Sequence, residues 1–275
     1  KFGENPACTS SAFIGHMTQA AAFIMFLVVA LTAIFASHFF IYYTLFHFFR
    51  IVDPQIDRTI VIIISVLALS FIISSLLAHW RENLFTRSLY FTSGIWLGLV
   101  INLLVGFVLS WLVIGVGRAL GISVNLVTLG IVAIIAASLY GGWGIWNAFH
   151  PGIKELEIKI NNLPVAWQGK TIVQISDVHL GHVFGQNLLQ KVVDKINEYN
   201  PEAVFITGDL FDGMDGRLDV QVKPLDEINS AQGVYFITGN HEKYFGLDKA
   251  KGILAKTRVQ VLSDEVRNIN GLQVV

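Results

Sequence analysis

Long uncharged stretches dominate the first 150 residues of the chain. The stretch between Glu4 and Arg50 holds 45 uncharged residues, and stretches of 22, 30 and 35 residues follow it before Lys154. A helix needs about 20 apolar residues to cross a bilayer, and buried helices of a soluble core are the less fitting alternative because these runs are so long and so many. The pattern predicts four membrane-spanning helices, near 22–46, 59–79, 92–116 and 125–148.

After Pro151 the pattern changes to short apolar runs separated by amphipathic and turn-rich segments. Apolar residues at helical spacing predict a helix over 186–199, and Asn270-Gly271 predicts a hairpin turn. The expected strands are 156–160, 171–175, 203–207, 234–238, 258–262, 265–269 and 272–275, and the other expected helices are 220–231 and 247–256. Strands that alternate with helices indicate an α/β fold with partly parallel pairing. We therefore divide the chain into a transmembrane domain, 1–150, and an α/β domain, 151–275.

The distribution of charge supports this division. Residues 1–150 carry 6 Lys and Arg and 4 Asp and Glu, whereas residues 151–275 carry 13 and 16. The formal net charge of −1 gives no basic excess, so no nucleic-acid partner is predicted. The single cysteine, Cys8, excludes an intramolecular disulfide and a cysteine-rich metal site.

The orientation in the membrane follows from the basic residues of the short loops. With four spans, both chain ends lie on one side of the membrane together with five Lys or Arg residues, and three lie on the other side. Basic residues favour the cytoplasmic side. We expect a multi-pass protein of the plasma or inner membrane with a cytoplasmic C-terminal domain.

Few residues in the predicted spans suggest chemistry. His38, His47 and Asn102 lie in or near spans, where an interhelical hydrogen bond is the expected role. A transporter with an accessory domain would need charged or interrupted helices along a pathway, and the sequence shows none.

Polar residues follow three of the predicted strands at the point where each strand ends. Strand 171–175 leads to Asp177 and His179, strand 203–207 to Asp209 and Asp212, and strand 234–238 to Asn240 and His241. Parallel neighbours bring such strand ends to one edge of a sheet, where α/β proteins bind ligands. Oxygen and nitrogen donors without sulfur suit Mn, Fe, Zn or Mg. The sequence thus predicts a site for two divalent metal ions, with Asp209 as the bridging carboxylate.

These motifs resemble those of the calcineurin-like metallophosphoesterases. The similar segments are Ser-Asp177-Val-His179-Leu-Gly, Gly-Asp209-Leu-Phe-Asp212 and Gly-Asn240-His241-Glu242. The N-terminal part with its predicted spans is similar to that of membrane-anchored members. The resemblance implies a β-sandwich flanked by helices. It also implies that Asp177 and His179 bind the first metal, Asp209 bridges both metals and Asn240 binds the second. His241 would then contact the phosphate, and a metal-bound hydroxide would attack phosphorus.

The sequence departs from the family pattern after His241. The family's later motifs supply further histidines, but no histidine follows His241 here. We expect the chain to be a fragment whose α/β domain is truncated, and a degenerate domain is the alternative. Asp212 is expected either to support the ligands or to cap a turn, Glu242 to form structural hydrogen bonds, and His182 to lie on a surface loop or to face the substrate.

Two functions remain open at this point. The first is a membrane-anchored phosphoester hydrolase with two divalent metal ions, acting on a phosphoester that is lipid-linked or amphiphilic at the membrane lipid surface. The second is a non-catalytic membrane sensor or scaffold with a degenerate phosphoesterase domain. A histidine-containing motif in the gene beyond Val275 would favour the enzyme.

Overall fold

The computed structural model describes residues 6–213 and 217–275, with side chains from residue 21 onward. The chain forms two compact units. The first unit holds the residues up to Ser75 together with Leu89–Ala148, and the second holds Leu76–Ser88 together with Phe149–Val275. The connection between the second and third long helices therefore belongs to the same unit as the α/β part.

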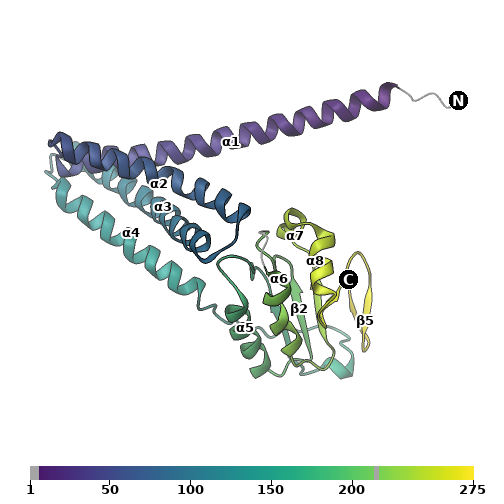
Figure 1. Ribbon diagram of the computed structural model, residues 1–275. Coiled ribbons are helices and arrows are strands. Elements are labelled where there is room, and N and C mark those ends of the chain that lie inside the picture. The colour runs from purple at the N-terminus through teal and green to yellow at the C-terminus, as the bar shows by residue number, and fades with distance from the viewer. Residues whose placement is uncertain (1–5, 214–216) are drawn as a thin grey trace. The chain divides into compact units, whose positions relative to one another are not determined.

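Four long helices account for the first 150 residues, as the uncharged stretches predicted. They are α1 (Pro6–Phe49), α2 (Pro54–Trp80), α3 (Leu84–Ala119) and α4 (Leu126–Ala148), coloured purple to teal in Figure 1. Each is long and apolar enough to cross a membrane. The four predicted spans are confirmed as helices. Helices α1, α2 and α3 extend beyond their predicted bounds at both ends, whereas α4 begins one residue later than predicted and ends at the predicted residue.

Polar side chains inside the first unit are paired between helices. The indole nitrogen of Trp96 donates to Nε2 of His38 at 2.9 Å, and Nδ1 of His38 lies 2.8 Å from the Ile34 carbonyl oxygen. Since Nε2 accepts a hydrogen bond, Nδ1 carries the proton and donates to that carbonyl. His38 thus has the structural, interhelical role that we expected of it.

The second unit contains a four-stranded parallel sheet. Its strands are β1 (Ile172–Ile175), β2 (Ala203–Thr207), β3 (Val234–Ile237) and β4 (Gln260–Val261), hydrogen-bonded in the order β1-β2-β3-β4. The helical segments are η1 (Val165–Trp167), α5 (Gln186–Glu198), α6 (Leu218–Gln221), η2 (Lys223–Glu227), α7 (Asn240–Phe245) and α8 (Leu247–Leu254). The predicted α/β fold with parallel pairing is confirmed.

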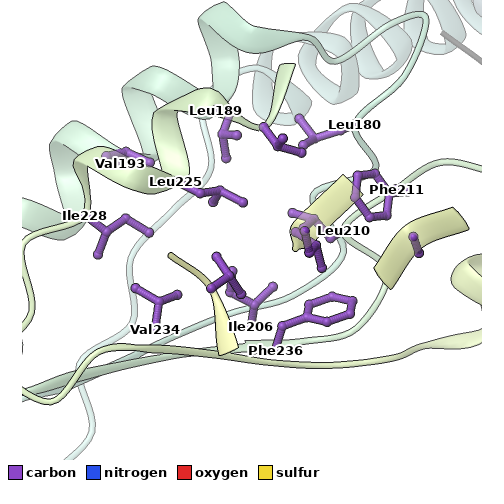
Figure 2. Packing of buried hydrophobic residues seen from close by; sticks show 14 of the residues in the cluster. Leu180, Leu189, Val193, Ile206, Leu210, Phe211, Leu225, Ile228, Val234 and Phe236 are labelled. Carbon is purple, nitrogen blue, oxygen red and sulfur yellow. The ribbon is translucent and has the colours of Figure 1, made fainter. Parts of the chain in front are cut away.

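The main hydrophobic core lies on the helical face of this sheet. Leu189 and Val193 of α5 pack with Leu225 of η2 against Ile206 and Phe236 of the central strands, and all five belong to one buried cluster (Figure 2). Helix α5 follows the predicted amphipathic pattern, since its buried residues Leu189, Val193 and Ile196 are spaced four and three residues apart. This core holds the central strands, and therefore their ends, in fixed positions.

A hairpin covers the other face of the sheet. Strands β5 (Arg267–Ile269) and β6 (Leu272–Val274) pair antiparallel around Asn270-Gly271, as predicted. Ile269 packs with Trp167 and Tyr235, and the indole nitrogen of Trp167 donates to the Ile269 carbonyl at 3.0 Å. The two sheets enclose this second cluster, an arrangement consistent with the expected sandwich.

One predicted strand is wrong. Residues 156–160 alternate apolar and charged side chains, but the structure assigns them no strand, and Leu156 and Ile158 are 69% and 72% exposed. Alternation specifies which face of a strand is apolar, but a strand also needs a neighbour for its backbone hydrogen bonds. Within the described ranges, residues 156–160 pair with no strand.

Candidate metal centre

The ends of β1, β2 and β3 meet at one edge of the parallel sheet. Backbone hydrogen bonds continue past β1 and β2, from the Asp177 amide to the Gly208 carbonyl at 3.3 Å and from the His179 amide to the Asp209 carbonyl at 3.1 Å. The segment after β1 thus runs beside the segment after β2, which places residues 177–179 next to Asp209.

Three of the predicted site residues have unusual backbone conformations. Asp177, His179 and Asp209 have φ angles of 56°, 51° and 51°, in the left-handed region. Non-glycine residues rarely adopt this region. Each such residue costs about 1–3 kcal/mol, so the conformation persists only where the surrounding structure holds it. Such conformations are concentrated at functional sites.

A cluster of possible metal ligands forms at this edge. Ligand atoms of His179, Asp209 and His241 all lie within 4.8 Å of one another, and the three side chains are partly exposed. The imidazole rings of His179 and His241 meet edge to face, with centroids 4.4 Å apart. Side-chain atoms that share one ion at about 2.0–2.2 Å lie roughly 3–4 Å apart, so the cluster is close to the spacing of ligands around an ion.

The other two predicted ligands lie next to this cluster in the chain but are more exposed. Oδ1 of Asp177 is 3.8 Å from Nε2 of His179, and the Ser176 hydroxyl donates to Oδ2 of Asp177. Asn240 is the first residue of α7, and its side chain is exposed. The structure therefore brings His179, Asp209 and His241 together, with Asp177 beside His179 and Asn240 preceding His241.

Hydrogen bonds orient His241. Its Nδ1 lies 2.9 Å from the carbonyl oxygen of Asp212. Because a carbonyl only accepts, Nδ1 must carry a proton, which leaves Nε2 with a lone pair in the neutral ring. The backbone carbonyl of Asp212, rather than its carboxylate, thus selects the tautomer of His241. The sequence predicted that Asp212 supports the ligands or caps a turn, and it did not predict this contact of its main chain.

Glu242 joins the loops that carry the site. Its side chain is fully buried, and its Oε2 accepts hydrogen bonds from the Asp209 amide at 3.0 Å and the Gly239 amide at 2.7 Å. Oε1 accepts one from the Phe211 amide at 3.1 Å. Three amide donors offset the cost of burying this carboxylate. Glu242 therefore has the structural role that we expected.

Close approach of two loops requires glycine at two positions. A Cβ atom on Gly239 would collide with the Asp209 carboxylate, and one on Gly208 would lie 2.8 Å from the Gly239 Cα atom. Gly208 also has a φ of 91°. Only glycine permits both this contact and this conformation.

His182 does not lie on the surface, contrary to one of its expected roles. Its side chain is 4% exposed, within the segment that follows His179. Spacing along the chain showed that His182 is near the site, but the sequence has no signal for its burial.

The residues present fit a divalent cation. Two imidazoles and one carboxylate converge, a second carboxylate lies beside them, and the partly exposed cluster is open to solvent. Nitrogen and oxygen donors of this kind suit Mn, Fe, Zn or Mg. The main-chain contact to His241 and the amide contact to Asp209 are the supporting hydrogen bonds that orient ligands in metal sites.

Comparisons with known proteins identify the domain that carries this cluster. The profile of the calcineurin-like phosphoesterase family matches residues 170–272. A transmembrane protein with metallophosphoesterase domain from Danio rerio is 37% identical over 115 residues, which are 42% of this chain and 26% of that protein. The protein of the same name from Bos taurus is 32% identical over 137 residues, 49% of this chain and 31% of that protein.

A bacterial relative matches a similar share of this chain. An uncharacterized metallophosphoesterase from Aquifex aeolicus is 30% identical over 139 residues, 50% of this chain and 53% of that protein. The matches span about a quarter to a half of these three relatives. No solved structure is significantly similar to the chain. Residues 170–272 therefore match the calcineurin-like phosphoesterase family, and they follow four helices that are long and apolar enough to cross a membrane.

Proposed function

We propose that the protein hydrolyses phosphoesters at a site for two divalent metal ions. The convergence of His179, Asp209 and His241 at the end of the parallel sheet, inside the domain that matches the family, is the observation that carries this proposal. The membrane-anchored hydrolase is favoured over the non-catalytic scaffold because possible ligand atoms of His179, Asp209 and His241 lie within 4.8 Å of one another.

Each site residue has a proposed role. Asp177 and His179 hold the first ion, Asp209 bridges the two ions and Asn240 holds the second. When bound, Mn, Fe, Zn or Mg ions would supply a hydroxide nucleophile and neutralise charge on the phosphate. His241 contacts the phosphate through Nε2, because Nδ1–H is bonded to the carbonyl of Asp212; Nε2 donates to a phosphate oxygen when the ring is protonated at both nitrogens.

The substrate that we propose is a phosphoester with an apolar part. Four apolar helices place the chain in a bilayer, and an enzyme held there meets lipid-linked or amphiphilic substrates at high local concentration. We also propose that the phosphoesterase domain, residues 151–275, faces the cytoplasm, because five basic residues lie on its side of the predicted spans and three on the other.

An assay of the intact membrane protein tests the activity. Wild-type protein, Asp209→Asn and the control Asp248→Asn are given an aryl phosphodiester or monoester with Mn²⁺. Asp248 is an exposed residue of α8, so its substitution removes one charge away from the cluster. We expect Asp209→Asn to lose at least about a hundredfold in turnover, and the control to match the wild type. Undiminished metal-dependent turnover of Asp209→Asn would contradict the proposal.

The same preparation tests the substrate class. Lipid pyrophosphates and lipid phosphodiesters in mixed micelles are compared with soluble phosphoesters of the same leaving group. A higher kcat/KM for the lipid substrates supports the amphiphilic class, and equal values contradict it. Loss of all turnover on every phosphoester, in wild-type protein with bound metal, would favour the scaffold.

A further inference from the structure

The segment directly after the metal ligand His179 forms a compact loop, residues 180–184, which we call the post-ligand loop. Its ends are joined by a bridge between Leu180 and Phe184, and the Gly181 amide donates to the Phe184 carbonyl at 2.8 Å. Leu180 is fully buried and also bridges to Phe211. The position of this loop therefore affects the backbone that carries the His179 imidazole.

Arg87 contacts this loop from a distant part of the chain. Its Nε donates a hydrogen bond of 3.1 Å to the carbonyl oxygen of His182, which is 95 residues away in the sequence. Both residues belong to the second compact unit, which includes Leu76–Ser88. A guanidinium donor makes a stronger hydrogen bond than a neutral one, and Arg87 is half-buried, so water screens the contact less.

The connection between α2 and α3 is built to present Arg87. The Thr86 amide donates to Oδ1 of Asn83 at 3.0 Å, and the Asn83 amide donates to Oγ1 of Thr86 at 3.1 Å. These reciprocal bonds cap the start of α3. The Thr86 hydroxyl also lies 2.8 Å from the Arg81 carbonyl, to which it donates. Arg87 therefore leaves a fixed turn rather than a free chain.

A second contact reaches the same loop from the residue that follows α4. The rings of Phe149 and Phe184 meet edge to face with centroids 5.2 Å apart, and both residues belong to the second unit. Arg87 lies in the first turn of α3, and Phe149 follows Ala148, the last residue of α4. Two residues of the second unit that are distant in sequence from the post-ligand loop, Arg87 and Phe149, thus contact this loop.

We propose that Arg87 is a positioning residue, which keeps the post-ligand loop and hence His179 in place for metal binding. This inference rests on the proposed function, because it assigns His179 to a metal. It makes the α2–α3 connection, which belongs to the second unit, a supporting part of the metal centre.

The matched control is Arg81. It lies in the same connection, carries the same charge and has an exposed side chain. Arg87→Ala and Arg81→Ala therefore remove equal charge from the same segment, but only the first removes a donor to the loop. Arg87→Lys keeps the charge while removing the Nε donor, and it serves if Arg87→Ala does not fold.

Amide hydrogen exchange of the intact chain without metal is the first measurement. We expect the amides of residues 181–184 to exchange about tenfold faster in Arg87→Ala than in wild-type protein. Strand β2, residues 203–207, is the internal reference and should be unchanged in both alanine variants. Equal loop exchange in Arg87→Ala and Arg81→Ala would overturn the proposal, as would equal acceleration in the loop and in β2.

Mn²⁺ titration of the same proteins is the second measurement. We expect affinity to fall about tenfold in Arg87→Ala and to remain at the wild-type value in Arg81→Ala. Unchanged affinity in Arg87→Ala would overturn the positioning role. Wild-type protein that binds no Mn²⁺ would instead count against the proposed function, and the exchange measurement would still decide whether Arg87 holds the loop.

Discussion

The carboxylate of Asp209 accepts a hydrogen bond of 2.8 Å from the backbone amide of His241, 32 residues further along the chain. The bond ties the loop after β2 to the start of α7. It occupies Oδ1 and orients the carboxylate so that a second oxygen remains for a cation. The geometry of the cluster is therefore set by main-chain groups as well as by side chains, which makes nearby structural residues sensitive to substitution.

Glu242→Gln should destabilise the protein strongly. The amide group of glutamine places a donor where a carboxylate oxygen now accepts from the amides of Asp209, Gly239 or Phe211. Loss of a buried acceptor of this kind costs about 2–4 kcal/mol in the free energy of unfolding. Denaturant unfolding of the α/β unit, followed by tryptophan fluorescence, measures the change. Glu265→Gln, at an exposed position, is the control and should unfold like the wild type.

Gly239→Ala should weaken metal binding as well as stability. The added methyl group would collide with the Asp209 carboxylate and move it out of the cluster. Mn²⁺ titration should show affinity reduced about tenfold or more, with a lower unfolding midpoint. Gly252→Ala is the matched control, because a Cβ atom there meets nothing within 4 Å in helix α8. It should raise stability by roughly 0.5–1 kcal/mol. A Gly239→Ala protein that binds Mn²⁺ like the wild type would show that the close approach does not matter.

The pH dependence of stability should reflect Glu202. Hydrogen bonds from Lys170, at 2.8 Å, and from Gln232 lower the pKa of this carboxyl group. Because the pKa is lower in the folded state, the contribution is complete above the ordinary value of about 4.3 and is lost as pH falls through the folded-state pKa. Glu202→Gln should therefore have a lower unfolding midpoint than wild-type protein near neutral pH and the same midpoint at low pH. A difference that persists unchanged below the folded-state pKa would contradict this account.

The sequence predicted the elements whose signals are local. The length of each uncharged stretch predicted the four helices, because bilayer thickness sets how many apolar residues a span needs. Short apolar runs that end in polar residues predicted β1, β2 and β3, and their parallel pairing explains why Asp209 and His179 meet. The family resemblance then supplied the roles that we propose for these residues.

Other features depend on contacts that no local pattern specifies. Residues 156–160 have the alternation of a strand but no described pairing partner. Spacing did not reveal that the buried carboxylate of Glu242 binds three amides from three different positions. The contact between Arg87 and His182 joins a connection between apolar helices to a loop 95 residues away. Such long-range contacts follow from tertiary packing, which periodicity does not specify.

The most direct measurement of the central claim is the divalent metal content and affinity of the intact chain. Wild-type protein, Asp209→Asn and the control Asp248→Asn are freed of metal with a chelator, titrated with Mn²⁺ and compared. We predict that wild-type protein and the control bind Mn²⁺ alike, and that Asp209→Asn binds at least about tenfold more weakly while retaining the wild-type unfolding midpoint. Equal binding by all three proteins would contradict a metal centre in which Asp209 is a ligand beside Asp177, His179 and Asn240.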